Sequence, residues 1–382
     1  MGMIYFTSIL NVVKFFEQIS LLTVVTALFC GVSLLEMIRR GKIDIRSPYL
    51  LLPLVLIVIT WASLFWTQSQ SITMSRNYAY TILPVFFIMT HLSGLKQSDL
   101  KIVDKFIIFG GFCFVAYALI TQGFSGIMSG RFATTEDADQ NATCAILFLV
   151  AIVLVKNIIQ RREQKQPSGG YIFLLVWILW LYFMTGSRGG LLAAIVFILI
   201  MTLYGKRNKF MRILGVVAVA ALVVFVVAPN VLPENIYNRL FLGDSYQSTM
   251  DSEKDRVAIW TYCYETLVPN IKFYGYGSGV PPYLIGPHFD MLYRGIHNTY
   301  FAMFLEYGVL ALPFFLWLLG QLIKDAAKNK DRISVGAMLG VCVIIFFLES
   351  YSRTYMWCIL TYCLITSKGA LNEQKSQNEL LR

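Results

Sequence analysis

Charged residues are scarce in this chain. Only 14% of its 382 residues are Asp, Glu, Lys or Arg, whereas 57% are hydrophobic. A soluble domain of this length carries more charge. Apolar runs near the length of a bilayer crossing recur along the chain, and they are too continuous for barrel strands. Because the bilayer core permits only helices or closed barrels, the sequence predicts an all-α, polytopic membrane bundle.

Several other patterns are also lacking. Six of the seven cysteines lie in or near apolar runs, and only Cys263 falls in a large polar segment, so neither a disulfide framework nor a zinc site is indicated. Lys14 and Glu17 follow the first apolar stretch instead of preceding it, which does not fit a signal peptide. No internal repeat is evident, which disfavours a transporter built from related halves.

The apolar runs predict 11 or 12 transmembrane helices. Residues 3–16 form the weaker twelfth candidate, either interfacial or a further crossing. The eleven stronger spans are 19–38, 49–65, 78–92, 101–121, 141–156, 171–185, 187–205, 211–228, 297–323, 333–348 and 351–366.

The distribution of basic residues predicts the orientation. Loops rich in Lys and Arg face the cytoplasm, and such loops alternate here with loops poor in them. The C-terminus is therefore expected inside; the N-terminus is outside with eleven helices and inside with twelve. The net charge of +10 then reflects membrane orientation and gives no reason to invoke nucleic acid. The basic loops lie near 39–46, 96–105, 156–165, 206–212, 324–332 and 368–382.

The predicted spans and loops divide the chain into four parts. Residues 1–228 are N-terminal transmembrane helices, 229–296 a large extracytoplasmic loop, 297–366 C-terminal transmembrane helices and 367–382 a cytoplasmic tail. A loop as long as 229–296 is usually functional or disordered. Its aromatics and the sequence "YGYGSGVPPY" favour an ordered loop.

His297 is one of only three histidines, and Asn298 follows it just before an apolar run. A capping or interfacial histidine is one interpretation. The other is a general base, because a neutral imidazole can accept a proton from a hydroxyl near neutral pH. His288, in "IGPHFD", favours a surface role, and His91 a structural one.

The sequence "TGSRGG", residues 185–190, joins two apolar runs almost without a loop. Its glycines allow close approach of backbone to a ligand, and Ser187 can cap the helix that follows. The helix N-terminus and the forked cation of Arg188 together predict an anion site suited to phosphate. An arginine that snorkels to the interface is the alternative.

The sequence predicts a helix within residues 248–270, and Pro269 ends it. Arg256, Trp260 and Tyr264 are spaced by four and would share one face. An arginine beside aromatic rings can hold a phosphate while the rings stack on a sugar. The alternative is an amphipathic helix lying on the membrane surface.

The stretch 130–144 precedes a predicted helix, and there Arg131 and Asn141 are candidates for substrate contact. Asp137 and Asp139 form a D-x-D, which holds a divalent metal in some glycosyltransferases. Acidic residues also favour a helix N-terminus, and we favour that simpler interpretation.

Glu306 lies within an apolar run, where acids are costly and usually functional. It is expected to face a polar cavity and to pair with an arginine. Arg353 follows Glu349 by four residues in a short turn, either as a local ion pair or as a further phosphate contact.

Together, "GSRGG" between two helices, then Arg256 with Trp260, "FYGYGSG" and "HNTYFAMFLEYGVLAL" resemble the O-antigen ligase and Wzy polymerase superfamily. The resemblance covers most of residues 130–365. It implies a GT-C-like membrane glycosyltransferase of the bacterial inner membrane, with its active site on the periplasmic face.

What the resemblance implies is transfer of a glycan from undecaprenyl diphosphate to a hydroxyl acceptor, with inversion and without metal or cofactor. His297 would be the base, and Arg188 and Arg256 would bind the diphosphate in place of Mg²⁺. The substrate would contact Arg131, Asn141, Trp260, Tyr264, Asn298, Glu306 and Arg353.

The acceptor is either a lipid-linked repeat unit, as for a polymerase, or lipid A–core, as for a ligase. The motifs are shared by both, and the absence of any feature specific to lipid A–core favours the polymerase slightly. A polysaccharide-lipid flippase and a non-catalytic subunit of envelope assembly are the alternatives of other classes.

Overall fold

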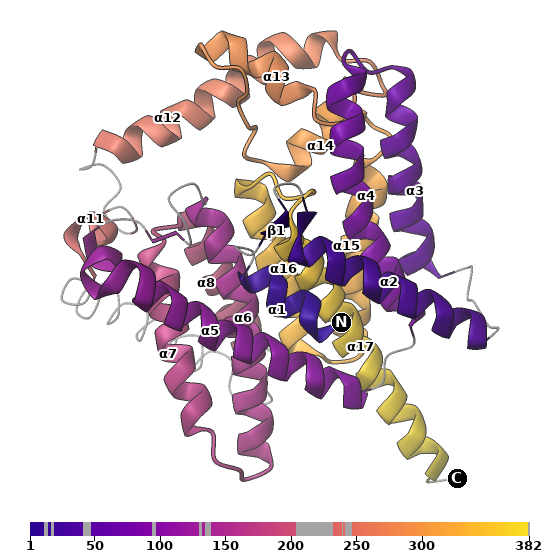
Figure 1. Cartoon of the computed structure of the whole chain (residues 1–382), viewed down its shortest axis with the longest axis vertical. Coiled ribbons are helices and arrows are strands. Elements are labelled where there is room, and N and C mark those ends of the chain that lie inside the picture. Colours follow the sequence, from indigo (N-terminus) through magenta and orange to yellow (C-terminus); the bar gives the residue numbers. More distant parts are fainter. Residues whose placement is uncertain are drawn as a thin grey trace.

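The protein is described from a computed structural model, and it is a helical membrane protein (Figure 1). The structure describes residues 1–10, 14–16, 19–40, 47–93, 97–129, 132–133, 139–203, 232–238, 240 and 247–380. The predicted span 211–228, Arg131 and Asp137 lie outside these residues, as does the boundary between 228 and 229.

Most of the predicted spans are helices in the described part of the chain. The elements are α1 (Gly2–Leu10), β1 (Lys14–Phe16), β2 (Ile19–Ser20), α2 (Leu21–Arg40), α3 (Pro48–Ala62), η1 (Ser63–Phe65), α4 (Gln70–Leu92), α5 (Gln97–Ser129), α6 (Gln140–Glu163), α7 (Gly169–Met184), α8 (Arg188–Leu203), α11 (Glu234–Tyr237), α12 (Gln247–Tyr262), η4 (Cys263–Leu267), η5 (Val268–Asn270), α13 (Pro281–Ile285), η6 (Gly286–Phe289), α14 (Thr299–Tyr307), α15 (Leu312–Lys328), α16 (Arg332–Phe347) and α17 (Thr354–Leu380).

Three stretches of the described chain are long and apolar enough to cross a membrane: Pro48–Phe65, Asp99–Met128 and Gln140–Glu163. Shorter apolar helices, including α7, α8 and α16, accompany them. The total of 11 or 12 crossings stays a prediction. α1 has nine residues, about 14 Å of helix, and strand β1 follows it. Residues 3–16 are therefore not one helix across the bilayer.

The prediction of one helix over 297–323 is wrong, because the chain breaks at Gly308. This residue has φ +59° and ends α14, and a Cβ there would collide with the carbonyl oxygen of Phe273. α15 restarts at Leu312 with Pro313 in its first turn. The break was not visible in hydrophobicity, since the apolar run continues through it.

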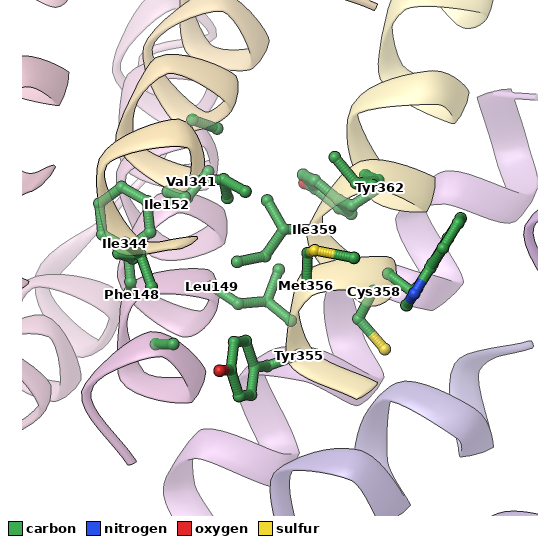
Figure 2. Close-up of a cluster of buried hydrophobic side chains, with 14 of the residues drawn as sticks. Phe148, Leu149, Ile152, Val341, Ile344, Tyr355, Met356, Cys358, Ile359 and Tyr362 are labelled. Atoms are coloured by element: carbon green, nitrogen blue, oxygen red, sulfur yellow. The ribbon is translucent and has the colours of Figure 1, made fainter. Parts of the chain in front are cut away.

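The core lies where α6, α8, α16 and α17 meet. Figure 2 shows Phe148 and Leu149 of α6, Val341 and Ile344 of α16, and Met356 and Ile359 of α17 gathered in one cluster. Gly336 and Gly340 let α16 approach its neighbours closely, because a Cβ at either would press on Phe197 or Phe148.

One ion pair is buried among the apolar helices. Lys156 Nζ of α6 lies 2.9 Å from Asp104 Oδ2 of α5, and the hydroxyl of Tyr362 of α17 donates to Asp104 Oδ1 over 2.7 Å. Asn157 Nδ2 donates to the same carboxylate. These partners compensate the cost of burying two charges, so the group ties three helices together.

The predicted long loop is ordered over its described part. Ile259, Cys263, Leu267 and Ile285 form a second core together with Leu305 of α14. Figure 1 shows α12 and α13 at one end of the bundle, with the α6–α7 turn and the C-terminus at the other. We call the α12–α13 end the capped end.

Candidate active site at the capped end

His297 lies in the connection between η6 and α14 and has the left-handed backbone angle φ +56°. This conformation is uncommon for a residue with a side chain and needs support from its surroundings. The hydrogen bonds of the preceding residue, Ile296, supply this support. Trp260 Nε1 donates to the Ile296 carbonyl over 2.8 Å, and the Ile296 N–H donates to Glu349 Oε2 over 3.2 Å.

The residues after His297 are fixed as well. The Asn298 side chain caps α14 by accepting the N–H of Phe301 at 2.9 Å. Thr299 Oγ1 donates to the Leu348 carbonyl and accepts the Ser350 N–H at 2.8 Å. The turn between α16 and α17 therefore bonds to the chain on both sides of His297 and fixes the backbone there.

The environment keeps His297 neutral. Burial, followed by the positive charge of Arg256, lowers its pKa to about 4, while Asp139 acts in the opposite direction. Arg256 of α12 is itself partly buried, and burial lowers its pKa against the attraction of Asp139. These three side chains, far apart in sequence, thus share one electrostatic environment.

Two other groups of this region have partners of their own. Asp139 caps α6, since its Oδ1 accepts from the Asn141 N–H at 2.8 Å and from Asn141 Nδ2 at 3.1 Å. Arg294 forms an ion pair of 2.7 Å with Asp255. In the part of the chain that the structure describes, no group of three or more His, Cys, Asp or Glu is placed to hold a metal ion.

Arg188 begins α8, as the "TGSRGG" pattern predicted. Ser187 Oγ accepts the Gly190 N–H at 3.2 Å, and a Cβ at Gly190 would collide with Cys144 Sγ. A Cβ at Gly189 would lie 2.9 Å from the ring of Phe347. The glycines therefore serve close packing of α8 against α6 and α16.

A continuous series of contacts links the start of α8 to the histidine segment. Gly189 packs on Phe347, the last residue of α16, and the neighbouring ring of Phe346 lies 6.1 Å from that of Trp260. Trp260 in turn bonds to the residue before His297. Arg188 and Arg256 therefore lie on helices, α8 and α12, that are linked through α16. His297 follows the residue to which α12 bonds.

Glu306 is buried and hydrogen-bonded. Its Oε1 accepts from the hydroxyl of Tyr80 and from the Gly279 N–H, each at 3.0 Å. It thus joins α14 to α4 and to the "GYGSG" segment. The predicted arginine nearby is Arg76 of α4, whose charge acts on Glu306 and Glu349 and whose guanidinium lies 5.5 Å from the Tyr293 ring centroid.

Other candidates lie further out. Tyr264 is 71% exposed, because α12 passes into the π-helical turn η4 before it and the spacing of four no longer sets its direction. Arg353 is exposed at the turn beside Glu349. His288 stacks on Tyr262 with ring centroids 4.1 Å apart, and His91 packs against Tyr49.

Sequence reasoning missed two contributors. Glu349 was noted only for its spacing from Arg353, yet its carboxylate accepts the Ile296 N–H. Arg76 lies at the start of an apolar helix and carries no motif. Neither has a local signal, since each matters only through residues distant in sequence.

Residues 173–316 match the family model described as O-antigen ligase. This part of the chain is similar to the O-antigen ligase family. The matched stretch includes Arg188, Arg256, Trp260 and His297. The match supports an enzyme of the ligase or polymerase type that acts on lipid-linked glycans. Comparison with curated proteins gives no match.

Proposed function

We propose that this membrane enzyme transfers a glycan from an undecaprenyl-diphosphate carrier to a hydroxyl acceptor at the capped end, which faces the periplasm. The single observation that supports it most is the meeting of His297 and Arg256. A neutral imidazole and a guanidinium share one partly buried environment within the O-antigen ligase domain.

In the proposed reaction His297 accepts the proton of the acceptor hydroxyl. The hydroxyl oxygen bonds to the anomeric carbon of the donor glycan from the face opposite the diphosphate, and the bond to the diphosphate oxygen breaks. A single displacement inverts the anomeric centre. The acceptor proton ends on His297, and the diphosphate leaves with the electron pair.

The leaving diphosphate is the group whose charge needs stabilisation. Arg256, with Arg188 at the N-terminus of α8, supplies cations and a helix end suited to phosphate. A bound diphosphate also offsets the positive charge that Arg256 exerts on His297. Donor binding therefore raises the pKa of His297 and makes it a stronger base when the acceptor is present.

The test is reconstitution of the purified chain with an undecaprenyl-diphosphate-linked glycan. Lipid A–core and a second lipid-linked repeat unit are offered as acceptors, each with and without EDTA. We expect product with one of these acceptors and no effect of EDTA. Loss of product on chelation would contradict the assignment of the two arginines to the role of Mg²⁺.

The matched variants are His297→Ala and His288→Ala. Both histidines lie in the same segment, but His288 stacks on Tyr262. Only His297→Ala should abolish transfer, with membrane levels unchanged. A non-catalytic assembly protein would tolerate both substitutions.

Sidedness is tested with Tyr264→Cys, since this side chain is exposed. An impermeant maleimide should label it from outside the membrane. Protection there would contradict the proposed topology.

A further inference from the structure

A groove of about 660 Å³ runs between α5 and α7, outside the site described above. On α5 its wall repeats every three or four residues, so one face of that helix lines it. The lining residues are Lys105, Ile108, Phe109, Phe112, Val115, Ala116 and Leu119 of α5, with Gly170, Tyr171, Phe173, Leu174 and Trp177 of α7.

The groove opens away from the helical core. Phe109, Phe112 and Phe173 are 55%, 58% and 68% exposed, respectively. α5 is one of the segments apolar and long enough to cross a bilayer, and exposed aromatic side chains on such a segment face hydrocarbon. Lipid chains therefore surround this groove, and its apolar walls fit them.

Positively charged side chains lie at one end of the groove. Lys105 lines the groove near the start of α5. Tyr171 lines it near the start of α7, and the Arg161 guanidinium lies 4.6 Å from the centroid of that ring. A long apolar slot that ends in cations is complementary to an acyl chain with an anionic headgroup.

The position distinguishes a phospholipid from the polyprenyl carrier. Tyr171 is one of the first residues of α7, whereas Ser187 and Arg188 follow its far end. Thirteen residues of helix, or about 20 Å, separate Tyr171 from Met184, the last residue of α7. A carrier with its diphosphate at Arg188 would have its charge at the opposite end from Lys105.

We propose that this groove binds one anionic phospholipid of the cytoplasmic leaflet, with its chain between α5 and α7 and its phosphate at Lys105. The proposal does not depend on the glycan-transfer reaction. It is measured without any donor or acceptor.

Trp177 in the groove wall provides the readout. The full chain in detergent is titrated with brominated phosphatidylglycerol, which quenches tryptophan fluorescence on contact, and in parallel with brominated phosphatidylcholine. We expect saturable quenching by phosphatidylglycerol at lower concentration than by phosphatidylcholine. Trp177→Phe should remove most of that quenching.

Lys105→Gln should weaken phosphatidylglycerol binding about fivefold, the effect of one lysine at a charged lipid surface. Lys101→Gln is the matched control, because Lys101 is exposed on α5 one turn earlier and does not line the groove. Equal effects of the two substitutions, or quenching unchanged in Trp177→Phe, would overturn the proposal. So would displacement of brominated phosphatidylglycerol by undecaprenyl phosphate at a lower concentration than by unlabelled phosphatidylglycerol.

Discussion

Glu349→Ala removes the acceptor of the Ile296 N–H, one residue before His297. Ile296 is fully buried, so water cannot replace the lost partner. A hydrogen bond to a carboxylate is worth about 1.5–3 kcal/mol, comparable to the about 1–3 kcal/mol that a left-handed residue costs. Without Glu349, the His297 segment is free to relax toward an ordinary backbone angle.

The magnitude follows from this energy. If 1.5–3 kcal/mol of support for the active conformation is lost, kcat falls about tenfold to about a hundredfold. The assay is glycan transfer by the reconstituted chain, normalised to the amount of folded protein. KM for the donor should change less than kcat, because Arg188 and Arg256 remain.

Glu349→Gln separates the hydrogen bond from the charge. Burial raises the pKa of Glu349, which lessens the advantage of its charged form, and an amide oxygen also accepts the Ile296 N–H. The glutamine variant should keep most of the activity. Glu265→Ala, at an exposed acid of η4, should keep all of it. Full activity of Glu349→Ala would refute the argument.

The remaining predictions concern His297 and Gly308. His297→Ala should abolish transfer without lowering the yield of folded protein. Activity of this variant near the original level would exclude His297 as the base. Because the pKa of His297 is about 4 in the folded chain against an ordinary value near 6.5, kcat/KM should hold as pH falls through 6.5 and decline only toward 4, which a pH–rate profile measures. The same depression means that His297 contributes stability above pH 6.5 that is lost as pH falls from 6.5 toward 4. Gly308→Ala should lower the thermal stability and the yield of folded protein, because φ is +59° and a Cβ meets the Phe273 carbonyl, whereas Gly320→Ala on α15 meets no neighbour and should not; equal melting temperatures for the two would contradict the described turn.

The motifs predicted the parts of the candidate site that one segment specifies. Ser187 and the glycines mark the start of α8, as the sequence predicted. These features depend on the neighbouring backbone, so their chemistry is readable locally. The match of residues 173–316 to the O-antigen ligase family agrees with the resemblance that the same motifs carry.

Other features could not be predicted from local sequence patterns. Tyr264 lies within the π-helical turn η4, which shifts its direction, and the break at Gly308 arises from contact with a carbonyl in the preceding loop. Glu306 is bonded to Tyr80 and to the Gly279 N–H, two partners that its own segment does not indicate. In each case a distant backbone or side chain decides.

The sequence by itself determined that this is a helical membrane protein and where most of its described helices lie, because hydrophobic burial in a bilayer depends on composition and length alone. Tertiary structure alone decided that the charges of Arg256 and Asp139 act on His297, that Glu349 accepts the N–H of the preceding Ile296, and that the imidazole stays neutral. Charge–charge interaction and desolvation depend on distance in space, and the folded packing of α12, α14 and the α16–α17 turn sets that distance.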